Sequence, residues 1–395
     1  MEFRREENLL LGLLGADDGS YQDEGIHGIS ASDWDSILQL SKRHSVAPFL
    51  YQRIKRLDPG EEIVPEVYQR LRDIYLYSAA LNMRLYHKLA KVLKILKDEG
   101  IPVIVLKGAY LAGVVYNKIG MRAMQDVDLL FKIKDLSRAQ KILIEKGYCQ
   151  PDSSLFLDIH WNIELSYADL NVEIEKVWER AKPADIAGVE VLVLCPEDLL
   201  LHLCMHLGFH HLFEFAGLRT LCDILETIRH YNGQIDWGQV RHRAIHWRVI
   251  NLVYLALLLA RDLLSADVPD SVMEDFKPDE FDPRVKEWAL EQIFRVKADT
   301  LSLSPYFWQL WRPGSFREKA TSLLKLIFPS PEFISQKYPT PYGSSKNYLY
   351  YLVRLKDHFY RYGHAMWRIL IRDKEMAILA KQHIRDLAMR EWLSS

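Results

Sequence analysis

The sequence predicts an α+β protein in which a small β-sheet lies inside a mostly helical chain. Short runs at 101–106, 126–133, 155–161 and 188–194 are apolar or alternate between apolar and polar residues, as strands do. The segments before and after these runs repeat apolar residues at helical spacing. The 395 residues are enough for two or three domains with a substantial core.

Residues 1–98 form the predicted N-terminal helical region. Ser32 is expected to cap a helix whose apolar side includes Ile37. Residues 65–98 repeat apolar side chains at helical spacing, and Gly100 follows where a C-terminal cap belongs. One long helix is therefore expected to end just before the first strand.

Residues 99–195 form the predicted α/β core. A helix at 109–116 is expected after the first strand, and Asp135 is expected to cap a second helix, 136–146. Pro196 then begins a helical region, 196–300, because proline fits the first turn of a helix.

Lys107 and Gly108 close the first predicted strand, and a helix is expected to follow. The arrangement strand, glycine, helix aims free backbone N–H groups at an anion. Gly108 would let a phosphate approach the backbone closely, and Lys107 would add a positive charge beside it. The alternative is that Lys107 is an ordinary lysine at a strand end.

Asp126 and Asp128 begin the second predicted strand, with Val127 between them. Residues i and i+2 of a strand point to the same face, so the two carboxylates are expected to stand side by side while Val127 faces the core. Adjacent carboxylates repel each other unless a cation lies between them. Mg²⁺ commonly uses one or two carboxylates together with substrate phosphates. We therefore predict a metal site here, for Mg²⁺ with Mn²⁺ as the alternative ion.

A third acidic residue is expected from the strand at 155–161. Asp158 and His160 share one face of that strand. Asp158 is the candidate third metal ligand or the general base for an acceptor hydroxyl, and His160 would orient it or contact the substrate. Glu164 has the same parity along the chain and is the alternative third carboxylate, in which case Asp158 is a structural turn residue.

The order of these residues resembles bacterial nucleotidyltransferases of largely unassigned substrate, in the polymerase-β-like superfamily. The resemblance rests on a set of short matches over about residues 90–240, namely Leu106-Lys107-Gly108, Arg122, Asp126-Val127-Asp128-Leu129-Leu130 and Asp158-Ile159-His160-Trp161. It implies a small mixed sheet flanked by helices and dependence on Mg²⁺. It also implies transfer of a nucleoside monophosphate from a nucleoside triphosphate, with ATP the expected one, and loss of pyrophosphate.

The sequence departs from the broad superfamily pattern at the phosphate site. The usual glycine-serine is Gly108-Ala109 here, so no side-chain hydroxyl is available, and seventeen residues separate Gly108 from Asp126. Lys107 and Arg122 are expected to compensate as phosphate contacts. Arg122 could instead be a solvated loop arginine.

Histidines recur at helical spacing after Pro196, at His202, His206 and His210, with His211 beside the last. Two histidines at i and i+4 share a helix face and could bind zinc. The segment lacks the glutamate of a His-Glu-x-x-His motif and a cysteine at ligand spacing. We therefore expect histidines that pack and form hydrogen bonds; the alternative is that one of them lines the nucleotide or acceptor cleft.

Arg219 and Asp223 lie one helical turn apart in the next predicted helix and are expected to pair. The resemblance suggests that this pair helps to close the cleft over the substrate.

Composition bears on partners and compartment. The net charge of −2 speaks against a dedicated nucleic-acid binder, so the favoured acceptor is a small molecule or a peptide or protein hydroxyl. Four cysteines without Cys-x-x-Cys spacing indicate reduced thiols in a cytoplasmic protein. The acidic N-terminus makes a poor signal peptide, and the longest apolar run, 252–260, is too short to span a bilayer.

Residues 301–395 are predicted to form a loop-rich segment followed by C-terminal helices dense in aromatic and basic residues. Such a helix most often packs its aromatic stripe on its own protein. A membrane surface is an alternative partner that we do not favour, and a nucleic-acid strand is less favoured still.

These observations predict a Mg²⁺-dependent nucleotidyltransferase. One alternative is a catalytically silent nucleotide-binding regulator, to which the missing hydroxyl at Ala109 would point. The other is an interaction protein that works through its C-terminal aromatic helices.

Overall fold

One five-stranded sheet organises the part of the chain that the computed structural model describes, which comprises residues 3–15, 28–57, 63–148, 156–163, 170–214, 217–295, 356 and 385–394. The strands are β1 (Val103–Val105), β2 (Val127–Phe131), β3 (Leu157–His160), β4 (Lys182–Ile186) and β5 (Val189–Val193). Their order across the sheet is β3-β2-β1-β5-β4. The pairs β1–β2 and β4–β5 are antiparallel, whereas β1–β5 and β2–β3 are parallel. The small mixed sheet implied by the resemblance is therefore confirmed.

Helices make up most of the other described residues, as predicted for an α+β protein. Before the sheet lie α1 (Arg5–Gly15), α2 (Ala31–Arg43), α3 (Ala47–Leu57) and α4 (Pro65–Asp98). Between the strands lie α5 (Lys107–Tyr110), the π-helix η3 (Leu111–Val115), α6 (Ile133–Glu145) and α7 (Ile174–Arg180). After the sheet come α8 (Pro196–Met205), the π-helix η4 (His206–His210), α9 (Gly217–His230), α10 (Trp237–His246), α11 (Ile250–Leu264), α12 (Asp270–Phe276) and α13 (Pro283–Phe294).

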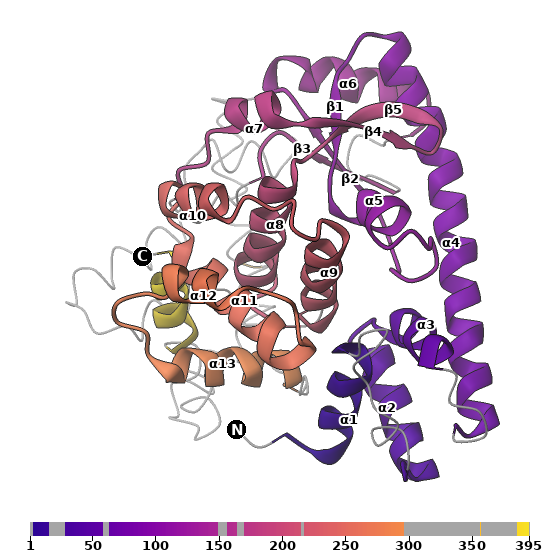
Figure 1. Cartoon of the computed structure of the whole chain (residues 1–395). Helices are drawn as coiled ribbons and strands as arrows, with labels where there is room; N and C mark the ends of the chain where they lie inside the picture. Colours follow the sequence, from indigo (N-terminus) through magenta and orange to yellow (C-terminus); the bar gives the residue numbers. More distant parts are fainter. Residues whose placement is uncertain are drawn as a thin grey trace. The chain divides into compact units, whose positions relative to one another are not determined.

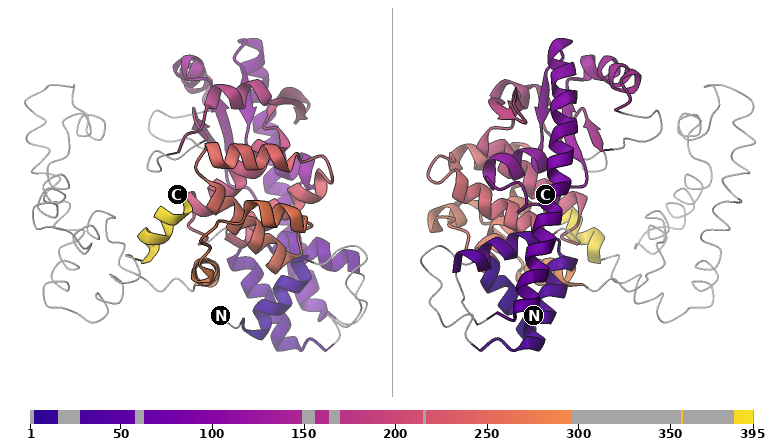
Figure 2. Two further views of the ribbon diagram at one scale, coloured as in Figure 1. Left: turned by 60° about the vertical axis from the view of Figure 1, so that its left-hand side comes forward. Right: turned by 90° about the vertical axis from the view of Figure 1, so that its right-hand side faces the viewer.

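The long helix α4 connects the sheet with the N-terminal helices (Figures 1 and 2). It packs against α2 and α3 in one part of its length and against β5 in another. Pro65 occupies its first turn, and Gly100 follows its end with φ +67°, as the sequence predicted. The cap of α2 differs from the prediction, because Ser30 rather than Ser32 is the N-cap and forms a capping box with Asp33.

Strand β4 was not predicted, because it contains Pro183 and charged residues. It lies at the edge of the sheet, where a proline costs no ladder hydrogen bond on the open side. A tight turn at Ala187 and Gly188, with φ +56° and +76°, connects it to β5. Two consecutive positive φ values are typical of the hairpin turn that matches the strand twist.

Helix α6 connects the parallel strands β2 and β3. Its N-cap is Lys132, and Asp135 lies in its first turn, so the predicted cap at Asp135 is wrong. An acidic residue in the first turn still stabilises the helix through its dipole. The crossover matters for function because it places β3 beside β2 with the same direction.

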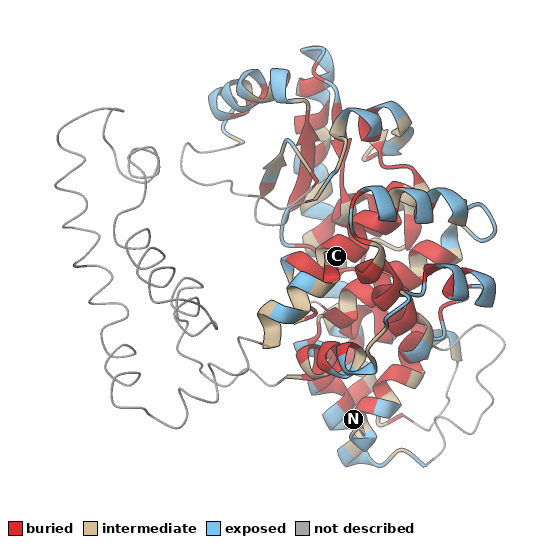
Figure 3. Ribbon diagram, turned by 90° about the vertical axis from the view of Figure 1, so that its left-hand side faces the viewer, coloured by how far each residue is buried: buried red, intermediate tan, exposed pale blue. Residues whose placement is uncertain are grey.

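The core of the helical part lies among α8, α9 and α11, which contact one another. Figure 3 shows this region as buried, in contrast to the exposed outer faces of the surrounding helices. Helix α11 is buried over nearly its whole length. None of the described helices has the length and apolar character that crossing a bilayer would require.

The chain divides into two compact units, Met1–Arg295 with Leu393–Ser395, and Val296–Trp392. The first contains the sheet and all the elements named above. Apart from residues 356 and 385–394, the predicted loop-rich segment and aromatic helices of 301–395 lie outside the described residues.

Candidate active site

The register between β2 and β3 brings two of the predicted acidic residues face to face. Asp128 pairs with Asp158, and Leu130 pairs with His160. Because alternate residues of a strand point to one face, Asp158 and His160 project on the same side of the sheet as Asp128. The Asp128 side chain is only 8% exposed, whereas that of Asp158 is 55% exposed.

Two cationic side chains neutralise this pair. Lys107 Nζ lies 2.8 Å from Asp128 Oδ1. His160 Nε2 lies 3.0 Å from the same Asp128 oxygen and 3.3 Å from Asp158 Oδ2. Lys107 reaches this position from the end of β1, which the backbone hydrogen bond from Leu106 N to Asp128 O ties to β2.

The protonation of the group follows from these contacts. Burial alone would raise the pKa of Asp128, but the hydrogen bond with His160 and the charge of Lys107 hold that pKa well below its usual range. The hydrogen bond with His160 also lowers the pKa of Asp158. Burial opposes protonation of His160, yet its two carboxylate partners raise its pKa to about 9. At neutral pH Asp128 and Asp158 are therefore carboxylates and His160 is an imidazolium.

Asp126 lies directly before β2, at the open side of the same group. The residue is exposed, but partial desolvation of its carboxyl group and then the charge of Asp128 raise its pKa. Asp158 acts in the same direction and Lys107 opposes it. The charges of all three predicted carboxylates are thus close enough to influence one another, and Val127 between the first two is fully buried, as predicted.

The donor chemistry of these residues fits a hard divalent cation. Carboxylate oxygens are the ligands that Mg²⁺ prefers, and three carboxylates, Asp126, Asp128 and Asp158, lie on or beside β2 and β3. One ligand atom each from Asp128, Asp158 and His160 lie within 4.8 Å of one another. An ion bound to Asp128 Oδ1 would take the place of its contact with Lys107 or His160.

Gly108 and Arg122 lie against each other behind the carboxylates. A Cβ atom at Gly108 would come 3.0 Å from Arg122 Nη1 and 3.4 Å from Met124 Sδ, so a side chain at this position has no free space. Arg122 is buried rather than solvated, and its Nε donates to both carboxylate oxygens of Asp223, at 2.8 and 3.0 Å. Asp223 also accepts a hydrogen bond from Tyr116. It therefore pairs with Arg122, where the sequence had suggested Arg219.

Asn82 of α4 is a residue that the sequence analysis missed. It is fully buried and donates to the carbonyl oxygens of Ile119 and Arg122, at 2.5 and 2.8 Å, and accepts from Met124 N. These bonds fix the loop between η3 and β2, which carries Arg122. A polar residue in the otherwise apolar stripe of 65–98 was the available signal.

His202 of α8 was expected to pack and form hydrogen bonds. It is buried, but neither of its ring nitrogens has a hydrogen-bond partner among the described residues. Burial first, and then the charge of Lys107, lower its pKa to about 3, while Asp128 opposes this shift. At neutral pH the His202 imidazole of α8 is therefore uncharged.

Among the described residues, the carboxylate group is exposed to solvent at Asp158. Two cavities, of about 210 and 460 Å³, are formed elsewhere, the first around Arg243 and the second around Pro102. The alternative third carboxylate, Glu164, lies outside the described residues.

Comparison with known proteins adds one finding to this geometry. Residues 30–265 match a family described as "Uncharacterised nucleotidyltransferase". No curated protein and no solved structure matches the chain.

Proposed function

The chain belongs to this family of uncharacterised nucleotidyltransferases, and on that premise we propose that it moves a nucleoside monophosphate from a nucleoside triphosphate to an acceptor hydroxyl in a Mg²⁺-dependent reaction. The observation that carries the proposal is the register of β2 and β3, which sets Asp128 opposite Asp158. Lys107, which follows the end of β1, forms an ion pair with Asp128. We also propose that the sheet and its flanking helices form a polymerase-β-like nucleotidyltransferase core.

Asp126, Asp128 and Asp158 would hold the magnesium ion. When bound, Mg²⁺ would neutralise charge on the phosphate oxygens of the nucleotide. The three carboxylates suit this role because they come from one strand end and one neighbouring strand, so backbone pairing fixes two of them before any ligand arrives. Because these two carboxylates are already in position, less entropy is lost when the site binds its ligands.

Lys107, Gly108, Arg122 and His160 are the proposed nucleotide-binding residues. Lys107 forms an ion pair with Asp128, close to where the phosphates would lie. When the nucleotide binds, the ammonium would leave Asp128 and contact a phosphate oxygen. Gly108 is buried, and its lack of a side chain leaves room for Arg122 Nη1. Arg122 has its Nε engaged by Asp223, so its charge is held in place beside Gly108. His160, protonated at neutral pH, would hold the two facing carboxylates in position.

The proposed reaction is an in-line displacement at the α-phosphorus. The acceptor oxygen forms a bond to this phosphorus, the bond from the phosphorus to the bridging oxygen of the β-phosphate breaks, and pyrophosphate leaves. The proton of the acceptor hydroxyl goes to Asp158, whose exposed carboxylate is unprotonated at neutral pH. His160 is not free to accept it, because its pKa of about 9 keeps it protonated.

The partners and the compartment are also part of the proposal. We propose ATP as donor and a small molecule or a peptide or protein hydroxyl as acceptor. A membrane surface is a partner that we do not favour, and nucleic acid is less favoured still. The three cysteines in the described part, Cys195, Cys204 and Cys222, are free and buried, which suits the reducing cytoplasm.

The experiment offers the protein each of four labelled nucleoside triphosphates, ATP, GTP, CTP and UTP, with Mg²⁺. We expect one of them to yield pyrophosphate together with labelled protein or labelled added acceptor. The proposal would be contradicted if the protein bound a nucleotide but released no pyrophosphate with any class of hydroxyl-bearing acceptor. That result would favour the catalytically silent regulator.

A further inference from the structure

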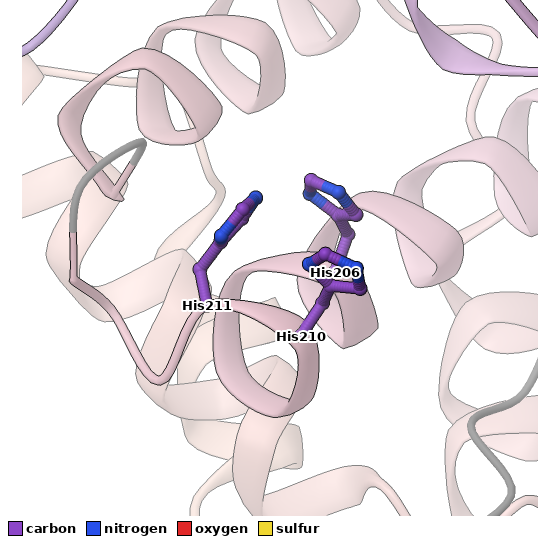
Figure 4. A group of neighbouring side chains, drawn as sticks. All are labelled: His206, His210 and His211. Atoms are coloured by element: carbon purple, nitrogen blue, oxygen red, sulfur yellow. The ribbon is translucent and has the colours of Figure 1, made fainter. Parts of the chain in front are cut away.

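Three histidines meet on one turn of the chain at the end of α8. The π-helix η4 spans His206–His210, and His211 N donates to His206 O across its last turn, at 3.2 Å. In an α-helix a residue five positions on lies about 140° around the axis. The wider π-turn returns His211 to the side of His206, so that both it and His210 flank that residue (Figure 4).

The three imidazole rings contact one another. Ring centroids are 4.9 Å apart for His206 and His210, 4.5 Å for His206 and His211, and 4.6 Å for His210 and His211. One nitrogen from each ring can be chosen so that all three lie within 4.8 Å of one another. Three nitrogen donors at this spacing are close enough for side-chain rotations to bring them around one ion.

Packing fixes this turn in place. A Cβ atom at Gly208 would come 2.2 Å from Leu252 Cδ1 of α11, so η4 lies directly on the helical core. Leu207 and Phe209, on either side of this glycine, are buried. The histidines are thus presented on a rigid turn, and π-turns of this kind occur frequently at functional sites.

The three rings are available as ligands. Neutral imidazole is the form of histidine that binds metals. Within the described residues, no hydrogen bond or ion pair occupies the three rings.

We propose that His206, His210 and His211 bind one transition-metal dication of the Zn²⁺ class. Imidazole nitrogens suit zinc and its neighbours, whereas Mg²⁺ prefers oxygen, so this histidine triad and the carboxylate group select different metals. His210 is exposed, which leaves a fourth coordination position open to water or substrate, as in catalytic rather than structural zinc sites. The inference rests on the triad alone and does not depend on the proposed nucleotidyl transfer.

The test is calorimetric titration of the chelator-treated full chain with Zn²⁺, in excess Mg²⁺ to occupy the carboxylates. We expect one Zn²⁺ per chain. His210→Ala and His211→Ala should each weaken binding at least about 100-fold, because even the outer partners of metal ligands are worth about 10- to 100-fold. Zn²⁺ should also raise the melting temperature of the unmodified protein but not of His210→Ala, whose altered side chain is exposed and should not impair folding.

Two variants serve as controls. His87→Ala removes an exposed histidine of α4 and should bind Zn²⁺ like the unmodified protein. Asp158→Asn should also retain Zn²⁺ binding, even though it is expected to lose nucleotidyl transfer. The proposal would be overturned if the unmodified protein did not bind Zn²⁺. It would also be overturned if both triad variants bound Zn²⁺ as tightly as the unmodified protein, or if Asp158→Asn lost Zn²⁺ binding.

Discussion

Lys107 and His160 supply the positive charge that allows Asp128 and Asp158 to lie opposite each other on neighbouring strands. Without a cation, facing carboxylates repel and one of them takes up a proton. Here both carboxylates have lowered pKa values, because each accepts from His160 and the more buried one also contacts Lys107. On the proposed assignment, Lys107 and His160 hold these carboxylates in place in the absence of the metal.

Replacing Lys107 with methionine tests this charge balance. Lys107→Met keeps the length of the side chain but removes the ammonium 2.8 Å from Asp128. We expect turnover to fall by about 10²–10³, the usual loss when one electrostatic stabiliser of a transition state is removed. Pyrophosphate release measures it, with Lys91→Met on the exposed face of α4 as control. Full turnover in Lys107→Met would show that this ammonium has no part in transfer.

His44 makes stability depend on pH. It is 2% exposed, and burial lowers its pKa to about 4. Above pH 6.5 neither folded nor unfolded His44 is charged, so its contribution to stability is intact. As the pH falls from 6.5 to 4, only the unfolded chain takes up the proton, which destabilises the fold by roughly 3 kcal/mol in total. Denaturant unfolding at several pH values should show a smaller loss in His44→Gln than in the unmodified protein, and His87→Gln should change nothing. An identical pH profile in His44→Gln would refute this assignment.

Among the elements, α4 does more than connect the N-terminal helices to the sheet. Through Asn82 it fixes the loop that precedes β2, and through Tyr86 it contacts Ala109 O beside the proposed phosphate site. Asp126 follows this loop directly. The position of the carboxylates therefore depends on a helix that ends before the sheet begins.

The substitution Asn82→Leu tests whether the loop before β2 has to be held in place for nucleotidyl transfer. It leaves the buried Arg122 carbonyl group, the part-buried Ile119 carbonyl group and the buried Met124 N–H without their partner, and each buried group of this kind costs about 1–3 kcal/mol. We expect a lower free energy of unfolding by roughly 3 kcal/mol and reduced turnover at temperatures where the variant is folded. Met83→Leu, at a side chain 62% exposed, is the control. Reduced stability with unchanged turnover would mean that the loop does not position the site.

The β4–β5 turn allows a pair of opposite predictions. Ala187 has φ +56°, a conformation that costs alanine about 1 kcal/mol and that asparagine tolerates better. Ala187→Asn should therefore raise the melting temperature slightly, whereas Gly188→Ala, at φ +76°, should lower it by the equivalent of about 1 kcal/mol. Thermal unfolding followed by circular dichroism measures both. Shifts of the same sign would contradict the turn geometry.

Across the whole molecule, the features that sequence could predict are those carried by near neighbours in the chain. Alternation along a strand was enough to place Asp158 and His160 on one face, and Gly100 and Pro196 marked helix ends. Contacts over long separations were not accessible, since nothing near Arg122 in sequence indicates Asp223, 101 residues away. The edge strand β4 was missed because Pro183 is tolerated only where the sheet ends, which is a property of the assembled sheet. The π-turn at His206 likewise depends on packing against α11.

The central claim is that the carboxylates on and beside β2 and β3 carry out nucleotidyl transfer. Its most direct measurement is pyrophosphate release with Mg²⁺ by Asp126→Asn, Asp128→Asn and Asp158→Asn, each confirmed as folded by circular dichroism. The control is Asp98→Asn, which changes an exposed aspartate at the end of α4. The account predicts loss of release by about 10²-fold or more in all three variants and none in the control. Undiminished release by folded Asp128→Asn would contradict it.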